Sequence, residues 1–192
     1  MEWVGKFLTN PLDLEHLEIV KHDMELDKWR YDQTPLNSIV IVSTMVDGCH
    51  FCIVPKEGAS VDESPVYYVS PTDSEDTVEW CAKDFIDFLS ITATIGNCYY
   101  IPCLHACEED EFWCLVEEAW GQGYEWYEEE KAQKQKAIKL LEEHFPLRKY
   151  DNLFQHINES YADINNHAKL EFASENIKEA KQGHFRLVNS FL

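Results

Sequence analysis

Basic residues, glycines and long apolar runs are all scarce in this sequence, and each scarcity excludes a class of function. The 192 residues carry 16 Lys and Arg against 36 Asp and Glu, which gives a formal net charge of −20. Such a field repels nucleic acid and anionic membranes, and it attracts cationic partners over a Debye length of roughly 8 Å. No run approaches the roughly 18 apolar residues of a membrane helix, and the opening residues lack the pattern of a secretory signal. We therefore expect a cytoplasmic protein that binds neither nucleic acid nor membrane.

The seven glycines are scattered, so the chain has neither a Walker phosphate loop nor a dinucleotide-binding pattern. The seven cysteines are odd in number and lack a repeat spacing, which indicates reduced thiols rather than a disulfide framework. With 45% hydrophobic and 13% aromatic residues, the chain should fold without metal or disulfide support. A pair of carboxylates could serve glycoside hydrolysis, but in so acidic a chain such pairs are too common to indicate that activity. We expect no cofactor and no metal.

The negative charge is concentrated in the middle of the chain. Residues 57–130 hold 19 Asp and Glu and one base, Lys83, whereas residues 131–192 hold 10 Lys and Arg and 8 acids. Aromatic residues lie among these acids, and such rings anchor protein interfaces while carboxylates steer the approach of a partner. Some of the rings must instead belong to the core, and an excess of Glu is also common on any solvated helix face. The aromatic residues are Trp113, Trp120, Tyr124, Trp126 and Tyr127, and the candidate partner-binding residues are Asp73, Glu75, Asp76, Glu108, Glu109, Asp110, Glu111, Glu117 and Glu118.

Three β-branched or aromatic runs joined by turns predict an antiparallel meander, with strands near 38–42, 49–55 and 66–69. Apolar spacing near 3.6 predicts helices over 10–30, where strand is an alternative, and over 77–93. Pro102 can open one helix or two, the second starting at the acidic run 108–111. Further elements are expected at 127–145, 151–164, 169–173 (a strand) and 174–181. With no repeat and no long linker, the sequence predicts one α+β domain over 1–192, with helices on one side of a mostly antiparallel sheet.

The stretch STMVDGCHFC brings an acid, a glycine, an imidazole and two thiols close together. In a strand Cys49 and His50 would point to opposite faces, and His50 and Cys52 would share a face but lie roughly 7 Å apart. A thiol- or metal-dependent hydrolase that uses these three residues is one alternative. The other is a strand, a turn and a second strand, in which Gly48 provides the turn conformation and Phe51 enters the core. We favour the structural interpretation.

A second group of thiols, near residue 105, is also a candidate for metal binding or catalysis. Cys103, His105 and Cys107 form an irregular cluster, which matches zinc spacing poorly. On a continuous helix Cys103, Cys107 and Cys114 would lie within about 40° of one another, which is the arrangement of a core-facing stripe. No catalytic constellation stands out, and a binding role is the better expectation.

The pieces IVIVSTMVDGCHFCIVP, SPVYYVSPTD and AKDFIDFLSITATIGN follow one another and precede an aromatic-rich acidic segment. In this order they resemble the SUKH superfamily of bacterial immunity proteins. The resemblance covers roughly residues 37–130, followed by a helical C-terminal extension at 131–192. Met45 and Val46 depart from it, because relatives often have two small glycines there. The matching positions include Asp47, Gly48, His50, Phe51, Pro65, Val66, Val69, Ser70, Pro71, Phe85, Phe88 and Leu89.

The resemblance implies an α+β fold and the neutralisation of a polymorphic bacterial toxin by direct binding, without catalysis. Members of this superfamily recognise very different toxins, so the resemblance does not name the target. The acidic middle of the chain fits a cationic nuclease, whose phosphate-binding Lys and Arg it would cover. The alternatives are the hydrolase described above and an interaction module of the same fold with no toxin partner.

Overall fold

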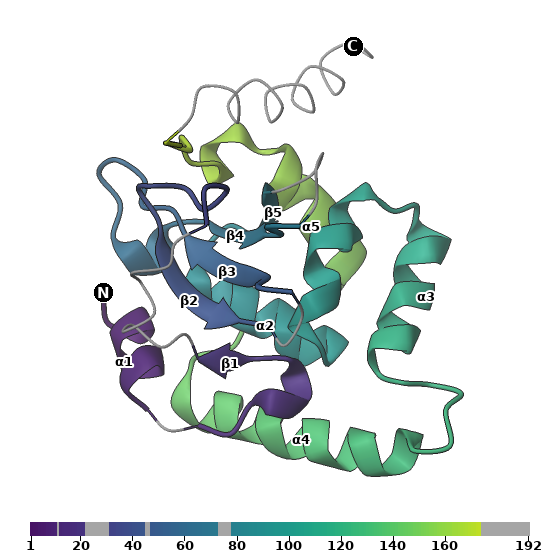
Figure 1. The fold of residues 1–192 in the computed structure, drawn as a ribbon. Coiled ribbons are helices and arrows are strands. Elements are labelled where there is room, and N and C mark those ends of the chain that lie inside the picture. The colour runs from purple at the N-terminus through teal and green to yellow at the C-terminus, as the bar shows by residue number, and fades with distance from the viewer. Residues whose placement is uncertain (11, 22–30, 45–46, 73–77, 174–192) are drawn as a thin grey trace.

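A computed structural model describes residues 1–10, 12–21, 31–44, 47–72 and 78–173 (Figure 1). Its strands form one antiparallel sheet in which the spatial order follows the chain order. The predicted α+β class and the predicted meander are both confirmed. The strands are β1 (Val20–Lys21), β2 (Ile39–Ser43), β3 (His50–Ile53), β4 (Val66–Val69) and β5 (Val78–Ala82).

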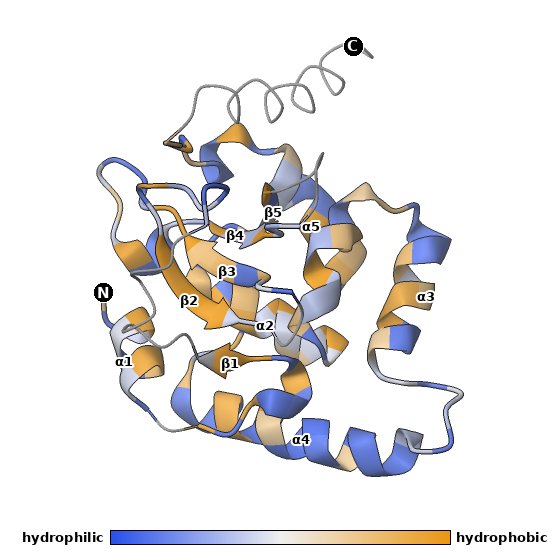
Figure 2. Ribbon diagram, viewed as in Figure 1, coloured by the Kyte–Doolittle hydropathy of each residue, from blue (hydrophilic) through white to orange (hydrophobic). Residues whose placement is uncertain are grey.

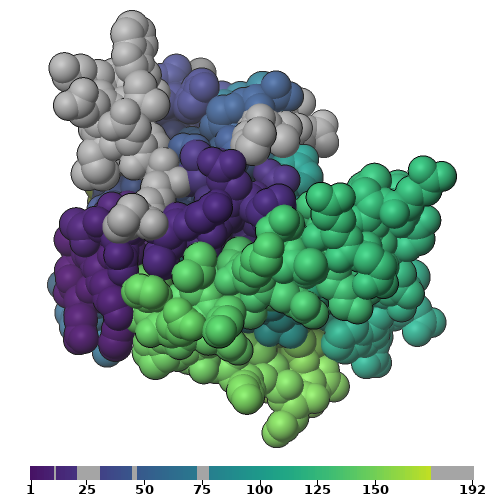
Figure 3. Space-filling model, turned by 90° about the horizontal axis from the view of Figure 1, so that it is seen from below, coloured from purple at the N-terminus to yellow at the C-terminus, as the bar shows by residue number. Residues whose placement is uncertain are grey.

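The helices predicted over 127–145 and 151–164 are also confirmed, as α4 and α5. The α-helices are α1 (Trp3–Thr9), α2 (Phe85–Ile95), α3 (Glu109–Ala119), α4 (Tyr127–His144) and α5 (Leu153–Ala162). Short 3-10 helices lie between and after them: η1 (Glu15–Leu17), η3 (Val61–Glu63), η4 (Cys98–Ala106) and, after α5, η5 (Ile164–Asn166). In Figure 3, α4 runs along the N-terminal segment that contains η1.

The main hydrophobic core lies between one face of the sheet and the helices. Phe88 of α2 packs on Phe51 of β3, with ring centroids 4.9 Å apart, and Phe85 packs on Phe7 of α1 at 5.3 Å. Helices α4 and α5 add side chains to the same cluster, so the C-terminal helices share the core of the sheet. Apolar residues concentrate in the sheet and α2, whereas α4 is largely hydrophilic (Figure 2). Because aromatic rings bury large apolar areas, these contacts dominate the packing energy.

A smaller cluster covers the other face of the sheet. Trp80 of β5 packs edge-on against Tyr161 at the end of α5, and its indole donates a hydrogen bond to the carbonyl of Asn166 at 3.1 Å. The Tyr67 hydroxyl accepts a hydrogen bond from the Ala168 amide at 2.9 Å. Every residue of β3 and β4 is consequently buried. The backbone after α5 therefore shields the face that the helices leave open.

Two helix predictions are wrong in part. The segment predicted as helix over 77–93 begins as strand β5 and becomes helical only at Phe85. Pairing with β4 outweighs the helix-like spacing of its apolar residues, because both faces of this strand find apolar neighbours. In the described part of 10–30, the helix is limited to η1, and β1 follows it, so the strand alternative holds there.

The remaining differences lie near Pro102 and near the C-terminus. The chain around Pro102 is the 3-10 helix η4, and α3 starts separately at the acidic run, as the second alternative proposed. The core-facing stripe of thiols required one continuous helix through this segment and does not form, and Cys103 and Cys114 are exposed. No strand forms at 169–173, although the Glu171 carbonyl accepts a hydrogen bond from the Leu36 amide at 2.6 Å. The helical turns predicted at 174–181 lie outside the described residues.

Candidate functional site

Helix α3 carries an acidic surface, which we define as Glu108, Glu109, Asp110, Glu111, Glu117 and Glu118. All six of these predicted contact residues are exposed. The other three, Asp73, Glu75 and Asp76, lie outside the described residues. Glu108 is the N-cap and the next three acids form the first turn, where carboxylates interact favourably with the positive end of the helix dipole. Glu117 and Glu118 lie at the opposite end, where the same dipole disfavours them.

The loop between α3 and α4 presents two exposed aromatic rings. Tyr124 and Trp126 stack face to face, with centroids 4.8 Å apart and planes at 9°, and 52% of each residue is exposed. Gly121 has a φ of +77°, and a Cβ atom there would lie 2.7 Å from the Trp126 ring. Glycine at this position therefore permits both the turn and the close approach of the Trp126 indole to the backbone. On α3 itself, Trp113 is 42% exposed.

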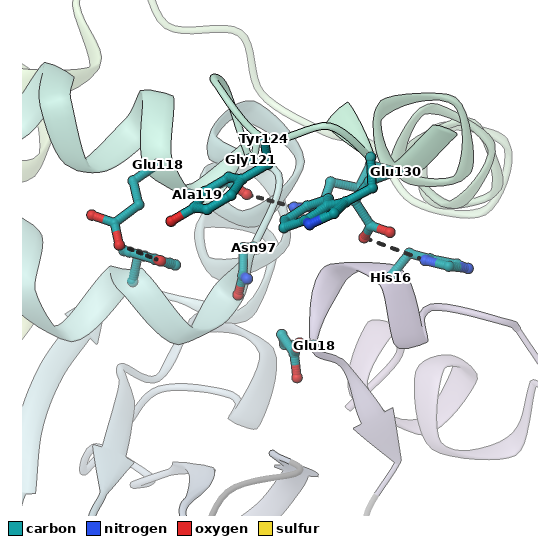
Figure 4. Close-up of a pocket in the computed structure, with 11 residues that line it drawn as sticks. His16, Glu18, Asn97, Glu118, Ala119, Gly121, Tyr124 and Glu130 are labelled. Carbon is teal, nitrogen blue, oxygen red and sulfur yellow. Dashed lines mark hydrogen bonds and ion pairs between the residues drawn. The ribbon is translucent and has the colours of Figure 1, made fainter. Parts of the chain in front are cut away.

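A pocket of about 510 Å³ opens beside this aromatic pair (Figure 4). Its walls come from η1, the start of η4, the end of α3, the loop that follows, and α4, so segments far apart in the sequence build it. Its volume lies within the range of roughly 300–1,000 Å³ that is typical of ligand sites. The lining residues are His16, Glu18, Asn97, Tyr100, Glu118, Ala119, Gly121, Tyr124, Trp126, Glu130 and Lys134.

Three carboxylates and one ammonium group set the charge of this pocket. The Tyr100 hydroxyl donates to Glu118 at 3.2 Å, and Glu130 lies 3.4 Å from the His16 ring. Burial, together with Glu118, raises the pKa of Tyr100 to about 12. Lys134 is buried and donates to the carbonyl of Ala119, and burial lowers its pKa. The pocket therefore keeps an excess of negative charge.

Glu18 differs from the other two carboxylates of the pocket. Within the described ranges its side chain makes no hydrogen bond and no ion pair, although it is half-buried. Its φ of 58° lies in the left-handed region, which costs a residue with a Cβ about 1–3 kcal/mol. Burial raises the pKa of this carboxyl, Lys134 partly offsets that shift, and Glu130 adds to it. Both the backbone and the charge of Glu18 are thus unfavourable to the fold.

The residues of the SUKH-like motif form the sheet and its core. Phe51, Phe85, Phe88 and Leu89 are fully buried, and the Pro65 carbonyl accepts a hydrogen bond from the Val54 amide at 3.1 Å. These five residues hold β3, β4 and α2 against one another, and none of them lines the pocket. Their arrangement explains why the motif predicts fold better than it predicts a site.

The turn at Asp47 and Gly48 has positive φ at both residues, 43° and 77°. A Cβ at Gly48 would lie 2.3 Å from the Tyr31 hydroxyl, so this close approach also needs glycine. His50 follows, and its two ring nitrogens lie 3.0 Å from Thr34 Oγ1 and 2.9 Å from the Gly48 carbonyl. The His50 ring therefore contacts the backbone of the turn that precedes β3.

Thiol and metal chemistry gains no support from this geometry. Cys49 is buried and lies 3.7 Å from the Ser70 hydroxyl, and Cys52 is buried in the smaller cluster. The two ring nitrogens of His50 lie against oxygen atoms, Thr34 Oγ1 and the Gly48 carbonyl. Burial raises the pKa of Cys81 and of Cys98, which makes these thiols less reactive. The described residues also contain no group of three or more His, Cys, Asp or Glu that could hold a metal ion.

A buried ionic network ties the chain after α4 to the start of α2. The Asp87 carboxylate is fully buried, accepts a hydrogen bond from the Tyr150 hydroxyl at 2.7 Å, and lies 2.9 Å from the His156 ring and 3.3 Å from the Arg148 guanidinium. Arg148 also contacts Asp84, the N-cap of α2, at 2.8 Å. The network joins α2 to α5 and is a structural feature of the fold.

Comparisons of the chain with protein-family models, with curated proteins and with solved structures found no match. No helix in the described part of the chain is long and apolar enough to span a membrane. The resemblance to the SUKH superfamily therefore stays a prediction from sequence motifs.

Sequence reasoning named the acidic surface and both rings of the aromatic pair, but it missed the pocket. Glu18 lies in a segment that we expected to be a helix or a strand, and Lys134 is one of several lysines on an amphipathic helix. No local pattern distinguishes these two residues. The left-handed conformation of Glu18 is the feature that singles it out, and it becomes visible only in three dimensions.

Proposed function

We propose that this protein is an immunity protein that neutralises a basic bacterial toxin, of the nuclease type, by binding it through the acidic surface of α3. The distribution of charge carries the proposal. Between Lys83 and Lys131 the chain has 12 Asp and Glu and no Lys or Arg, and all six members of the acidic surface are exposed. A nuclease binds phosphate with Lys and Arg, so an acidic protein can occupy the same surface.

Exposed aromatic rings beside the acidic surface support the same proposal. Carboxylates steer a cationic partner and raise its association rate, whereas desolvated rings supply most of the affinity. Trp113, Tyr124 and Trp126 are available for the second role. The sequence resemblance to SUKH proteins agrees with neutralisation by binding rather than by catalysis.

The experiment begins with capture of the partner from a lysate of the source organism at low salt and elution at high salt. The captured protein is then expressed alone and together with this chain. A basic protein that stops growth alone, and whose toxicity this chain relieves, supports the proposal. A partner that causes no toxicity contradicts it and favours an interaction module without a toxin.

A matched pair of variants tests the surface. One variant reverses Glu109, Asp110, Glu111 and Glu117 to Lys. The control reverses the same number of exposed carboxylates on and between α4 and α5, namely Glu142, Glu143, Asp151 and Glu159. The two variants have equal net charge, so only position separates them. We expect the α3 variant to associate about tenfold more slowly at low salt and to lose protection, and the control to keep it. Equal rates for both variants would contradict local steering.

A further inference from the structure

The pocket described above has the composition of a site for a cationic side chain. It combines an exposed aromatic pair, three carboxylates and a cavity of about 510 Å³ in one place (Figure 4). Aromatic faces attract cations, and guanidinium groups in particular stack on Trp and Tyr. Carboxylates hold guanidinium through charge-assisted hydrogen bonds. Either feature alone would be unspecific, but here the two line the same cavity.

We propose that this pocket binds the guanidinium group of an arginine side chain from the basic protein partner. Glu18 is the carboxylate that receives it, and the stacked rings of Tyr124 and Trp126 form the aromatic wall. The inference rests on the proposed function for its choice of a protein partner. It adds that recognition uses one inserted side chain as well as a general attraction between charges.

The other charged groups of the pocket leave Glu18 to serve this role. Glu118 already accepts a hydrogen bond from Tyr100, and Glu130 lies against His16. Lys134 directs its ammonium group to the Ala119 carbonyl, and its positive charge is outnumbered by the three carboxylates. Glu18 alone among these carboxylates has no donor in the part of the chain that the structure describes. A guanidinium would supply the missing hydrogen bonds.

The cost of Glu18 to the fold agrees with a binding role. Its left-handed backbone and its half-buried charge both disfavour the folded state, and residues of this kind concentrate at functional sites. Replacing Glu18 by Gln removes the charge but keeps the shape of the side chain. We therefore expect Glu18→Gln to unfold at the same temperature as the parent or at a higher one, and to lose arginine binding.

The first test uses N-acetyl-arginine methylamide as the probe and its citrulline analogue, a neutral isostere, as the matched control. Binding is followed by NMR through the indole N–H resonance of Trp126, which a Trp126→Phe variant assigns. We expect a saturable shift with the arginine probe and a dissociation constant about tenfold larger for citrulline and for Glu18→Gln. Glu109→Gln, which changes the acidic surface outside the pocket, should bind the probe as the parent does. Equal shifts from both probes, or no shift up to their solubility limit, would overturn the site.

A second test identifies the source of the side chain. An arginine-rich peptide should bind more tightly than the free probe, because it also contacts the acidic surface. Glu109→Gln should therefore weaken binding of the peptide but not binding of the probe. A peptide that binds no better than the free probe would overturn the choice of a protein partner and point to a small cation. The growth experiment tests the immunity function separately. Failure of the probe to bind would overturn the pocket, whereas failure to relieve toxicity would overturn the immunity function.

Discussion

Helices α2 and α3 have the same length, 11 residues, but α2 lies in the core whereas α3 is mostly exposed. Nine residues of α2 are buried, whereas α3 buries two, Phe112 and Ala119. Helix α2 has the N-cap Asp84, whose side chain accepts a hydrogen bond from the Asp87 amide, and the C-cap Gly96 in the left-handed conformation. Helix α3 has no side-chain cap and begins with charged residues.

The comparison separates the part of the chain that specifies the fold from the part that is open to a partner. Almost any change in α2 removes packing or a buried polar contact, because close-packed interiors respond to the loss of single methylene groups. The exposed face of α3 can vary in sequence with small effects on stability. Variants in the two helices test this division, and they are given in order of decreasing effect.

The largest effect is expected for Phe88→Ala in α2. The ring is fully buried against Phe51, so its removal leaves a cavity and should cost about 3–5 kcal/mol in free energy of unfolding. Trp113→Ala in α3 removes a larger side chain that is 42% exposed, and should cost under about 1 kcal/mol. Urea denaturation followed by circular dichroism measures both. Similar losses for the two variants would contradict the division between the helices.

The second prediction concerns Asp87, the buried carboxylate of α2. Asp87→Ala leaves Arg148 and His156 without their common partner and should cost about 3 kcal/mol. Asp151→Ala, at an exposed carboxylate, is the control and should change stability by less than about 0.5 kcal/mol.

The same carboxylate makes stability depend on pH. Burial alone would raise the pKa of Asp87, but the His156 hydrogen bond and charge and the Tyr150 hydrogen bond outweigh it, and the pKa lies below its ordinary value of 3.8. A lowered pKa in the folded state stabilises the protein fully above pH 3.8, and this contribution is lost as the pH falls through the folded pKa. Unfolding free energies measured from pH 6 downward should therefore fall less steeply for Asp87→Ala than for the parent. Parallel curves would show that the network is not coupled to protonation of Asp87.

The third prediction lies where the two helices meet. Gly96 ends α2 with a φ of +77°, and a Cβ there would lie 2.9 Å from the Trp120 ring at the end of α3. Gly96→Ala should cost about 1–2 kcal/mol, of which part is backbone strain and part is displacement of the indole. Gly58 has nearly the same φ, +78°, with open space around it, so Gly58→Ala measures the strain alone. A cost for Gly96→Ala no larger than for Gly58→Ala would show that Trp120 moves freely.

The sequence allowed most of the sheet to be predicted, but not its ends. Strands β2, β3 and β4 follow from their β-branched and aromatic runs, because such residues fit a pleated and buried surface. The sequence predicts helix where β5 forms, because Trp80, Phe85 and Phe88 have helix-like spacing across the junction with α2. Pairing with β4 makes this segment a strand, and pairing between distant segments is not visible in a local pattern.

The candidate site was predictable in its charge and unpredictable in its shape. Counting acids located the acidic surface, because exposure follows from a run of carboxylates on a short helix. The pocket needs η1, η4 and α4 to meet, and the segment with η1 was expected to fold differently. Glu18, the carboxylate that we propose receives an arginine, is one of 36 Asp and Glu in the chain, and composition gives no reason to choose it.

The smallest effects are expected at the two ends of α3, and they should have opposite signs. Neutralising the first turn, with Glu109→Gln and Glu111→Gln, removes a favourable interaction with the helix dipole and should lower stability by up to about 1 kcal/mol. Neutralising the last turn, with Glu117→Gln and Glu118→Gln, removes an unfavourable interaction with the dipole, while the new amide oxygen at position 118 can still accept the Tyr100 hydrogen bond. Stability should therefore rise by about 0.3 kcal/mol. The two double variants have the same net charge, so each is the control for the other. Both differences should shrink in high salt, because exposed charges are screened. A change above about 2 kcal/mol at either end would mean that α3 is as integral to the fold as α2.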